Sequence, residues 1–137
     1  MIIIKNNFIP FGRYTTMNLY GLLFTKRNNL KDDVINHEGI HSVQILELAI
    51  VGILFTLLLI FIFKISYWYL LFGGSLFYIW YLIEYIFVRL FHKKQNDGYH
   101  DISLEEEAYN NEDNMNYLNN RKLFAWCKYI KPKSFKK

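Results

Sequence analysis

The sequence contains a single cysteine, Cys127, and only 2 prolines and 7 glycines among its 137 residues. One cysteine excludes an internal disulfide framework and a cysteine-rich zinc module. The composition, 53% hydrophobic and 19% aromatic, excludes a disordered or low-complexity chain, because such chains lack the apolar side chains that form a core. A chain of this length forms one domain-sized unit, which excludes an enzyme with separate binding and catalytic modules.

Charge is also scarce, above all in the middle of the chain. Residues 45–63 hold one acid, Glu47, and residues 65–83 hold no charged side chain. As helices, these two 19-residue segments would each be roughly 28 Å long, close to the thickness of the hydrocarbon core of a membrane. The sequence therefore predicts two transmembrane helices joined near Lys64. The alternative is a buried hairpin in a soluble domain, but so short a chain could hardly cover two helices that are apolar all round. The N-terminus lacks the long apolar core of a cleaved signal, so we expect the first helix to be retained.

Lysine and arginine set the expected orientation. They crowd both flanks of the apolar region, and Lys64 stands alone between the two segments. The positive-inside rule then predicts an integral protein of the inner (cytoplasmic) membrane with both termini in the cytoplasm. The aromatic run 67–69 suits the far interface, and the stretch from Arg89 to Lys94 suits the near one. The basic, aromatic C-terminus predicts contact with membrane lipid, and no nucleic-acid partner is expected.

The N-terminal flank, residues 1–29, predicts a small β-hairpin, because short β-favouring runs alternate there with turn-forming residues. Within it, Leu22, Leu23, Phe24 and Thr25 form the last such run. From about Leu30 the pattern becomes helical, with Asn29 as the expected N-cap, and the helix should continue into the first apolar segment. Residues 30–92 form this helix and the membrane hairpin.

Residues 93–137 form the predicted C-terminal part. A turn is expected at 95–98. Ser103 and Glu106 have the spacing of a capping box, which predicts a helix over 103–111. A last amphipathic helix is expected over 117–130. The whole chain is thus predicted to be a mainly α membrane protein: a two-helix transmembrane hairpin with a short N-terminal β-hairpin and C-terminal amphipathic helices.

The most informative motif is the pentapeptide His37-Glu38-Gly39-Ile40-His41. On a helix, residues four apart lie on one face, so His37 and His41 can bind one zinc ion while Glu38 serves as general base toward the attacking water. Two unligated histidines on a solvated helix face are the alternative. The position of the motif at the entrance of a membrane helix favours a functional site.

A catalytic zinc site requires a third protein ligand. The candidates are His92, His100 and the acids between Glu105 and Glu112, and we favour Glu105 because the small Ala108 on the same helix face allows a close approach. The further residues expected near the metal divide into two groups. Glu107 and Glu112 could accept hydrogen bonds from the outer ring nitrogens of the histidines, and Tyr99, His100 and Tyr109 could stabilise a transition state.

The order HEGIH, apolar hairpin, Glu105-Glu106-Glu107-Ala108 resembles the HExxH and ExxA motifs of the integral-membrane gluzincin metallopeptidases, the group that includes the heat-shock protease HtpX and the CAAX prenyl endopeptidases. The resemblance implies His37, His41 and Glu105 as zinc ligands and Glu38 as the catalytic acid. It also implies that Leu22–Thr25 is an edge strand that pairs with substrate. The chain differs at Tyr109, where that group has the aspartate that supports a ligand histidine.

Two functions therefore follow from the sequence. One is a zinc-dependent membrane endopeptidase that hydrolyses polypeptide at the cytoplasmic face of the membrane. The other is a small accessory or scaffold subunit of a larger membrane complex, with an inert or structural metal site.

Overall fold

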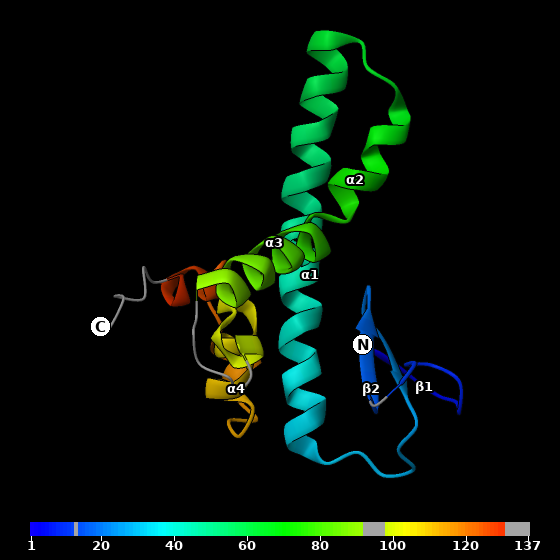
Figure 1. Ribbon diagram of the computed structural model, residues 1–137, viewed down its shortest axis with the longest axis vertical. Coiled ribbons are helices and arrows are strands. Elements are labelled where there is room, and N and C mark those ends of the chain that lie inside the picture. The colour runs from blue at the N-terminus through cyan, green and yellow to red at the C-terminus, as the bar shows by residue number, and fades with distance from the viewer. Residues whose placement is uncertain (13, 92–97, 131–137) are drawn as a thin grey trace.

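A computed structural model describes residues 1–12, 14–91 and 98–130 (Figure 1). In chain order its elements are β1 (Ile2–Lys5), β2 (Thr16–Leu19), β3 (Leu22–Thr25), α1 (Asp32–Phe63), the 3-10 helix η1 (Tyr67–Tyr69), α2 (Leu70–Gly74), α3 (Leu76–Phe91), η2 (Gly98–Asp101), α4 (Ser103–Asn111), α5 (Tyr117–Asn120) and η3 (Ala125–Tyr129). The fold is mainly helical, as predicted. Most of the turn expected at 95–98, the candidate ligand His92, Lys93, Lys94 and the C-terminal residues 131–137 lie outside the described residues.

The N-terminal strands form a three-stranded sheet in the order β1-β3-β2. The predicted hairpin is present as β2 and β3, which turn at Tyr20 and Gly21, both with positive φ (51° and 81°), as a tight two-residue turn requires. β1 adds a parallel partner on the other side of β3. The prediction that residues 22–25 form an edge strand is therefore wrong, because β3 is central and the edges belong to β1 and β2.

α1 is a single helix of 32 residues that carries HEGIH in its first turns and the first apolar segment after it, as predicted. It begins at Asp32 with Lys31 as N-cap, so the expected start at Leu30 with Asn29 as N-cap is wrong. In the described part of the chain, α1 is the one unbroken helix long and apolar enough to cross a membrane.

The second predicted span is not one helix. Residues 67–74 and 76–90 are long and apolar enough to cross a membrane only when they are taken together, and they meet at a bend of 56°. Contacts distant in sequence explain the break. Gly52 of α1 and Gly73 of α2 approach so closely that a Cβ on either would collide with the other's backbone, which holds α2 against α1. At the bend, the Ser75 hydroxyl hydrogen-bonds the Tyr20 hydroxyl of the β2–β3 turn at 2.8 Å.

Glu84 connects α3 to the start of α4. Its carboxylate accepts hydrogen bonds from the backbone N–H and the hydroxyl of Ser103, at 2.8 and 2.7 Å, at the start of α4. α4 has the predicted bounds, but the capping box is wrong: Ile102 is the N-cap, with no side-chain capping bond, and the acid comes from α3 instead of Glu106. A carboxylate favours this position because the first N–H groups of a helix lack intrahelical partners.

The predicted helix over 117–130 is also wrong. The structure has only the single turn α5 and the 3-10 helix η3, separated by Arg121 in an extended conformation and Phe124 in a left-handed one (φ 52°). This break directs Arg121 inward toward two buried carboxylates, and that tertiary contact outweighs the helical pattern of the sequence.

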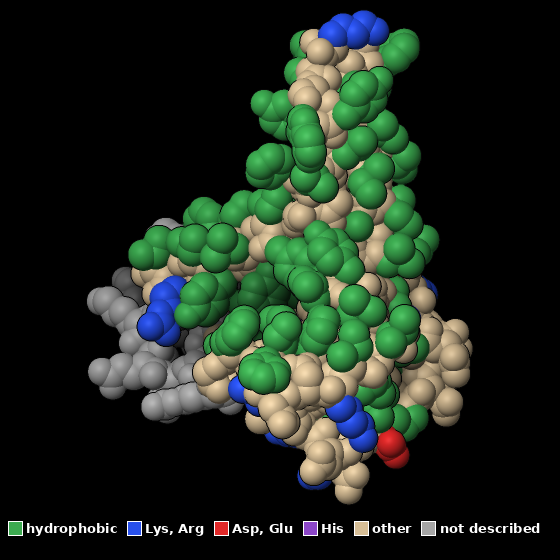
Figure 2. Space-filling model, turned by 90° about the vertical axis from the view of Figure 1, so that its right-hand side faces the viewer, with side chains coloured by type: hydrophobic (Ala, Val, Ile, Leu, Met, Phe, Trp, Pro, Cys, Tyr) green, Lys and Arg blue, Asp and Glu red, His purple; other side chains and the backbone are tan. Residues whose placement is uncertain are grey.

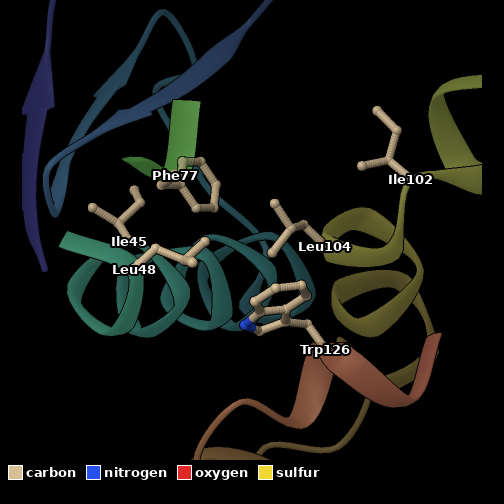
Figure 3. Close-up of a cluster of buried hydrophobic side chains, with 6 residues drawn as sticks. All are labelled: Ile45, Leu48, Phe77, Ile102, Leu104 and Trp126. Carbon is tan, nitrogen blue, oxygen red and sulfur yellow. The ribbon is translucent and has the colours of Figure 1, made fainter. Parts of the chain in front are cut away.

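The hydrophobic core joins four parts of the chain (Figure 3). Its buried members are Ile45, Leu48, Phe77, Ile102, Leu104 and Trp126. They come from α1, α3, α4 and the segments beside it, so α4 is fixed against the HEGIH end of α1. From the level of this core upward, residues 46–74 project from the rest of the molecule (Figure 1). We call this projection, made of the upper part of α1 with η1 and α2, the apolar arm.

Candidate metal centre

His37 and His41 lie one turn apart on α1 and direct their Nε2 atoms into the same space. The two Nε2 atoms are 3.1 Å apart, and the side chains belong to residues that are only 9% and 6% exposed. The sequence places them so because residues four apart share a helix face. Two buried imidazoles with converging ring nitrogens are a geometry suited to a shared metal ion.

Glu105 of α4 completes the group. Its Oε2 lies 3.5 Å from His37 Nε2 and its Oε1 lies 3.5 Å from His41 Nε2, while Oε1 also accepts a hydrogen bond from the Tyr81 hydroxyl at 2.9 Å. Oε2 is buried without a hydrogen-bond partner among the described residues. Burial opposes ionisation of Glu105, but the positive charge of His41 and the nearness of both imidazoles to the carboxylate outweigh burial and hold the pKa of the carboxyl well below its usual range.

These three residues could hold a metal ion, because one ligand atom from each lies within 4.8 Å of the others. The ligand atoms of one tetrahedral ion are about 3.3 Å apart for bonds of about 2.0–2.1 Å, close to the observed separations. The orphaned Glu105 Oε2 fits the same interpretation, since a buried carboxylate oxygen normally has a partner. The structure thus brings together the three ligands predicted from the sequence.

The outer nitrogens of the histidines are also engaged. His37 Nδ1 lies 2.8 Å from Glu112 Oε2, one of the two contacts expected for the acidic helix. His41 Nδ1 lies 2.8 Å from Gln44 Oε1, whose amide nitrogen donates to Glu107 Oε2 and to the Leu104 carbonyl, both at 3.0 Å. The expected contact between Glu107 and a histidine is therefore absent from the described part of the chain. Glu107 instead accepts a hydrogen bond from Gln44, which contacts His41. Such contacts orient ligand imidazoles and fix their tautomers.

Gln44 was not predicted from the sequence. The available signal was its position three residues after His41, on the same side of α1, with an amide in an otherwise apolar stretch. Together Gln44 and Glu112 contact the outer ring nitrogens of both histidines.

A buried ionic cluster lies behind Gln44. The guanidinium of Arg121, 3% exposed, binds Glu47 at 2.5 and 3.1 Å and Glu107 at 2.7 and 3.2 Å. The Tyr117 hydroxyl donates to Glu107 and the Phe124 N–H donates to Glu47. Although burial alone would lower it, these carboxylates raise the pKa of Arg121. Sequence reasoning missed this cluster because Glu47 lies 60 residues from Glu107 and 74 residues from Arg121 in the sequence.

Glu38 is buried to a similar degree, 8% exposed, and lines a cavity of about 480 Å³ together with the three candidate ligands. The cavity wall opposite α1 includes Thr16, Met17 and Asn18 of β2. The Asn18 side chain ties this strand to α1 by donating to the Glu38 carbonyl at 2.7 Å and contacting the Ser42 hydroxyl at 2.9 Å. The cavity thus lies between the HEGIH helix and an edge strand.

β2, which lines this cavity, pairs with β3 on one side and is an edge strand on the other. Leu19 and Leu22 flank the two-residue turn, and the Lys26 N–H donates to the Thr15 carbonyl at 3.0 Å. Because paired residues of an antiparallel ladder alternate between bonded and non-bonded, the backbone groups of Thr16 and Asn18 point away from β3. They are available to pair with an extended peptide.

The three candidates for transition-state stabilisation are not equivalent. Tyr99 lines the cavity, and Tyr109 packs against His37 with ring centroids 4.6 Å apart. His100 lies behind Tyr109, at 4.2 Å between centroids, and is exposed. Burial and then Glu105 raise the pKa of Tyr99, and the same two causes raise the pKa of Tyr109 to about 12. Both tyrosines are therefore protonated hydrogen-bond donors at neutral pH.

The arrangement can bind a metal ion, hold a carboxylate beside it and offer a strand edge and phenolic donors to a ligand. Comparisons with known proteins add no family to this description: no protein-family model, no curated protein and no solved structure matches the chain.

Proposed function

We propose that the protein is a zinc-dependent endopeptidase, anchored in the membrane, that hydrolyses peptide bonds at the cytoplasmic face. The observation that carries this proposal is the convergence of His37, His41 and Glu105, with Glu38 in the same cavity. Two imidazole nitrogens and one carboxylate are a ligand set that zinc accepts in hydrolytic enzymes, in which the fourth position is open. A purely structural zinc site would have four protein ligands, and it would need neither Glu38 nor the cavity.

His37, His41 and Glu105 would hold the zinc, which supplies Lewis-acid polarisation of a carbonyl and acidifies water when bound. Glu38 would take the proton of the attacking water and return it to the leaving amine, so one carboxylate serves as base and then as acid. Tyr99 and Tyr109 keep their hydroxyl protons at neutral pH and can donate to the oxygen on which negative charge develops.

The substrate would bind as an extended segment along β2. Backbone groups of Thr16 and Asn18 would pair with it, in place of the β3 edge that the sequence suggested. Such main-chain pairing is tolerant of side chains, so selectivity would come from the aromatic and apolar cavity wall, which includes Phe11, Tyr14 and Phe77.

Glu38→Gln tests this proposal, because Glu38 is not a ligand. The purified protein, reconstituted with zinc, is incubated with a peptide mixture, and cleavage is followed by mass spectrometry. We expect the variant to retain about one zinc and to lose cleavage by about a hundredfold to ten-thousandfold. Asp113→Asn, an exposed acid beside Glu112, is the matched control and should cleave as the wild type does.

The accessory-subunit alternative makes the opposite prediction. If membrane proteomes of cells carrying wild-type and Glu38→Gln protein are identical, while deletion of the whole chain has a phenotype, the peptidase proposal is wrong and a scaffold role replaces it.

A further inference from the structure

α3 carries an apolar face that is exposed in the structure. Leu82, Ile83, Ile86 and Leu90 are 57%, 47%, 46% and 72% exposed. Their spacing of one, three and four residues places them on one side of the helix. The opposite side faces the folded part of the protein, where Tyr81 donates to Glu105. α3 is therefore amphipathic, with its polar and aromatic side turned toward the metal centre and its aliphatic side turned outward.

The exposed face lies on the same side as the apolar arm. In Figure 1, α3 runs across α1 at about the middle of its length, with the apolar arm above it and α4 below. Figure 2 shows hydrophobic side chains continuing from the projecting arm onto the lower part of the molecule without a polar band between them. The uncovered side of α3, which faces away from α4, is thus part of one surface with the arm.

The junction of α3 with α1 marks where this surface begins. Phe77, in the first turn of α3, packs in one cluster with Ile45 and Leu48 of α1. From the same level upward, α1 exposes large apolar side chains, beginning with Leu46 at 60% and ending with Phe63 at 67%. The 17 steps from Leu46 to Phe63 rise roughly 26 Å along the helix axis, which is close to the thickness of the hydrocarbon core. α3 therefore leaves α1 at the level of the near membrane boundary.

We propose that α3 is an interfacial helix, lying flat in the cytoplasmic boundary of the membrane with its exposed apolar face among lipid acyl chains, and that it does not cross the bilayer. Lipid is the occupant because the face continues the surface of an arm whose length already matches the bilayer. The exposed Arg89 lies at the edge of the face, where an arginine can reach lipid headgroups while its stem stays in the apolar layer. The 56° bend at Ser75 is what turns the chain from the arm into this plane.

This placement has a consequence for the metal centre. Leu82 and Arg89 line a cavity of about 540 Å³ together with Tyr14, Tyr81 and Tyr99, and these three tyrosines also line the cavity that holds the candidate ligands. The site would open beside the lipid surface, where it would receive juxtamembrane polypeptide. That consequence rests on the proposed function, whereas the placement of α3 does not.

Depth measurements on spin-labelled protein test the placement. In a Cys127→Ser background, single cysteines replace Leu82, Ile86 and Leu90, and the full chain is reconstituted in vesicles of phosphatidylcholine and phosphatidylglycerol. Relative collision with oxygen and with a water-soluble nickel complex then gives the depth of each label. Leu46→Cys and Leu54→Cys on α1, also eight residues apart and equally exposed, are the matched controls.

Eight residues rise about 12 Å along a helix axis. We expect the two α1 labels to differ in depth by about that amount. The three α3 labels should share one shallow depth, to within about half the 5.4 Å pitch of a helix. A 12 Å gradient along α3 would mean that it crosses the bilayer and would overturn the proposal. Labels that collide with nickel as freely as in water, or that are shielded from both reagents by a second copy or a partner, would overturn it as well. Ile83, on the same face, replaces any position whose variant does not reconstitute.

Discussion

Glu105 is the candidate ligand on which metal binding would depend most, because it is the one that α4 contributes. Glu105→Gln keeps the shape of the side chain and the acceptor for Tyr81 but removes the negative charge that faces both histidines. We expect it to lose most of the bound zinc, since a neutral amide is a poor zinc ligand. Elemental analysis of purified protein measures this, with Asp113→Asn as a control of equal charge change. Full zinc occupancy in Glu105→Gln would show that the third ligand lies elsewhere.

Gln44 has a supporting role that can be separated from that of a ligand. Its amide links the His41 ring to Glu107 and to the Leu104 carbonyl. Gln44→Ala should leave all three ligands in place but let the His41 ring rotate, which lowers zinc affinity about 10 to 100-fold. Competition with a chelator of known affinity measures the change. An unchanged affinity would mean that packing alone orients His41.

At this scale the sequence predicted that His37, His41 and Glu105 converge and that Glu38 lies beside them, because this placement depends on spacing within a helix and on two motifs. It did not predict Gln44 or Arg121, because a buried amide or guanidinium acquires its partners from segments that are distant in sequence. Glu107 shows the same limit. Its place in the acidic helix suggested a histidine contact. In the structure Gln44 makes that contact with His41, and Glu107 binds Gln44 and Arg121.

The elements were predicted best where local signals suffice. α1 follows from a long apolar segment, and the β2–β3 hairpin follows from a turn that requires positive φ. The bounds of α4 were also predicted, although the capping box that suggested them does not form. The second span and the helix over 117–130 failed for one reason. In each, contacts with other segments require a direction that a straight helix cannot provide: the Gly52–Gly73 approach and the Glu84–Ser103 hydrogen bonds in the first case, and the Arg121 ion pairs in the second.

The C-terminal segment should therefore depend on Arg121 for its attachment. Arg121→Ala removes the cation between two buried carboxylates, and leaving a buried charge unpaired costs about 3–5 kcal/mol. We expect a large fall in thermal stability and faster proteolysis after residue 116, because α5 and η3 would detach from α1 and α4. Lys122→Ala, at the next and more exposed position, is the control and should change little. Equal stability of the two variants would contradict a structural role for the cluster.

On the scale of the whole molecule, the metal centre restricts how the chain can sit in a membrane. His37 and His41 precede the apolar arm in sequence and Glu105 follows it, yet their side chains converge. The sheet, α4 and the C-terminal segment lie around the lower half of α1, and the arm projects away from them (Figure 1). If α1 crosses the bilayer, then α2 must return, and everything outside the arm lies on one side.

We predict from the positive-inside rule that this side is the cytoplasm, since both flanks are basic and Lys64 at the end of the arm is its one basic residue. Reporters fused to the N-terminus and to the C-terminus should both show a cytoplasmic location, and a reporter inserted at residues 64–66, between α1 and η1, should show the opposite side. The insertion is the control for crossing, because a chain that only rests on the surface would place all three reporters in the cytoplasm. Termini on opposite sides would separate Glu105 from the two histidines by the full bilayer, and no site built from these three residues could then exist.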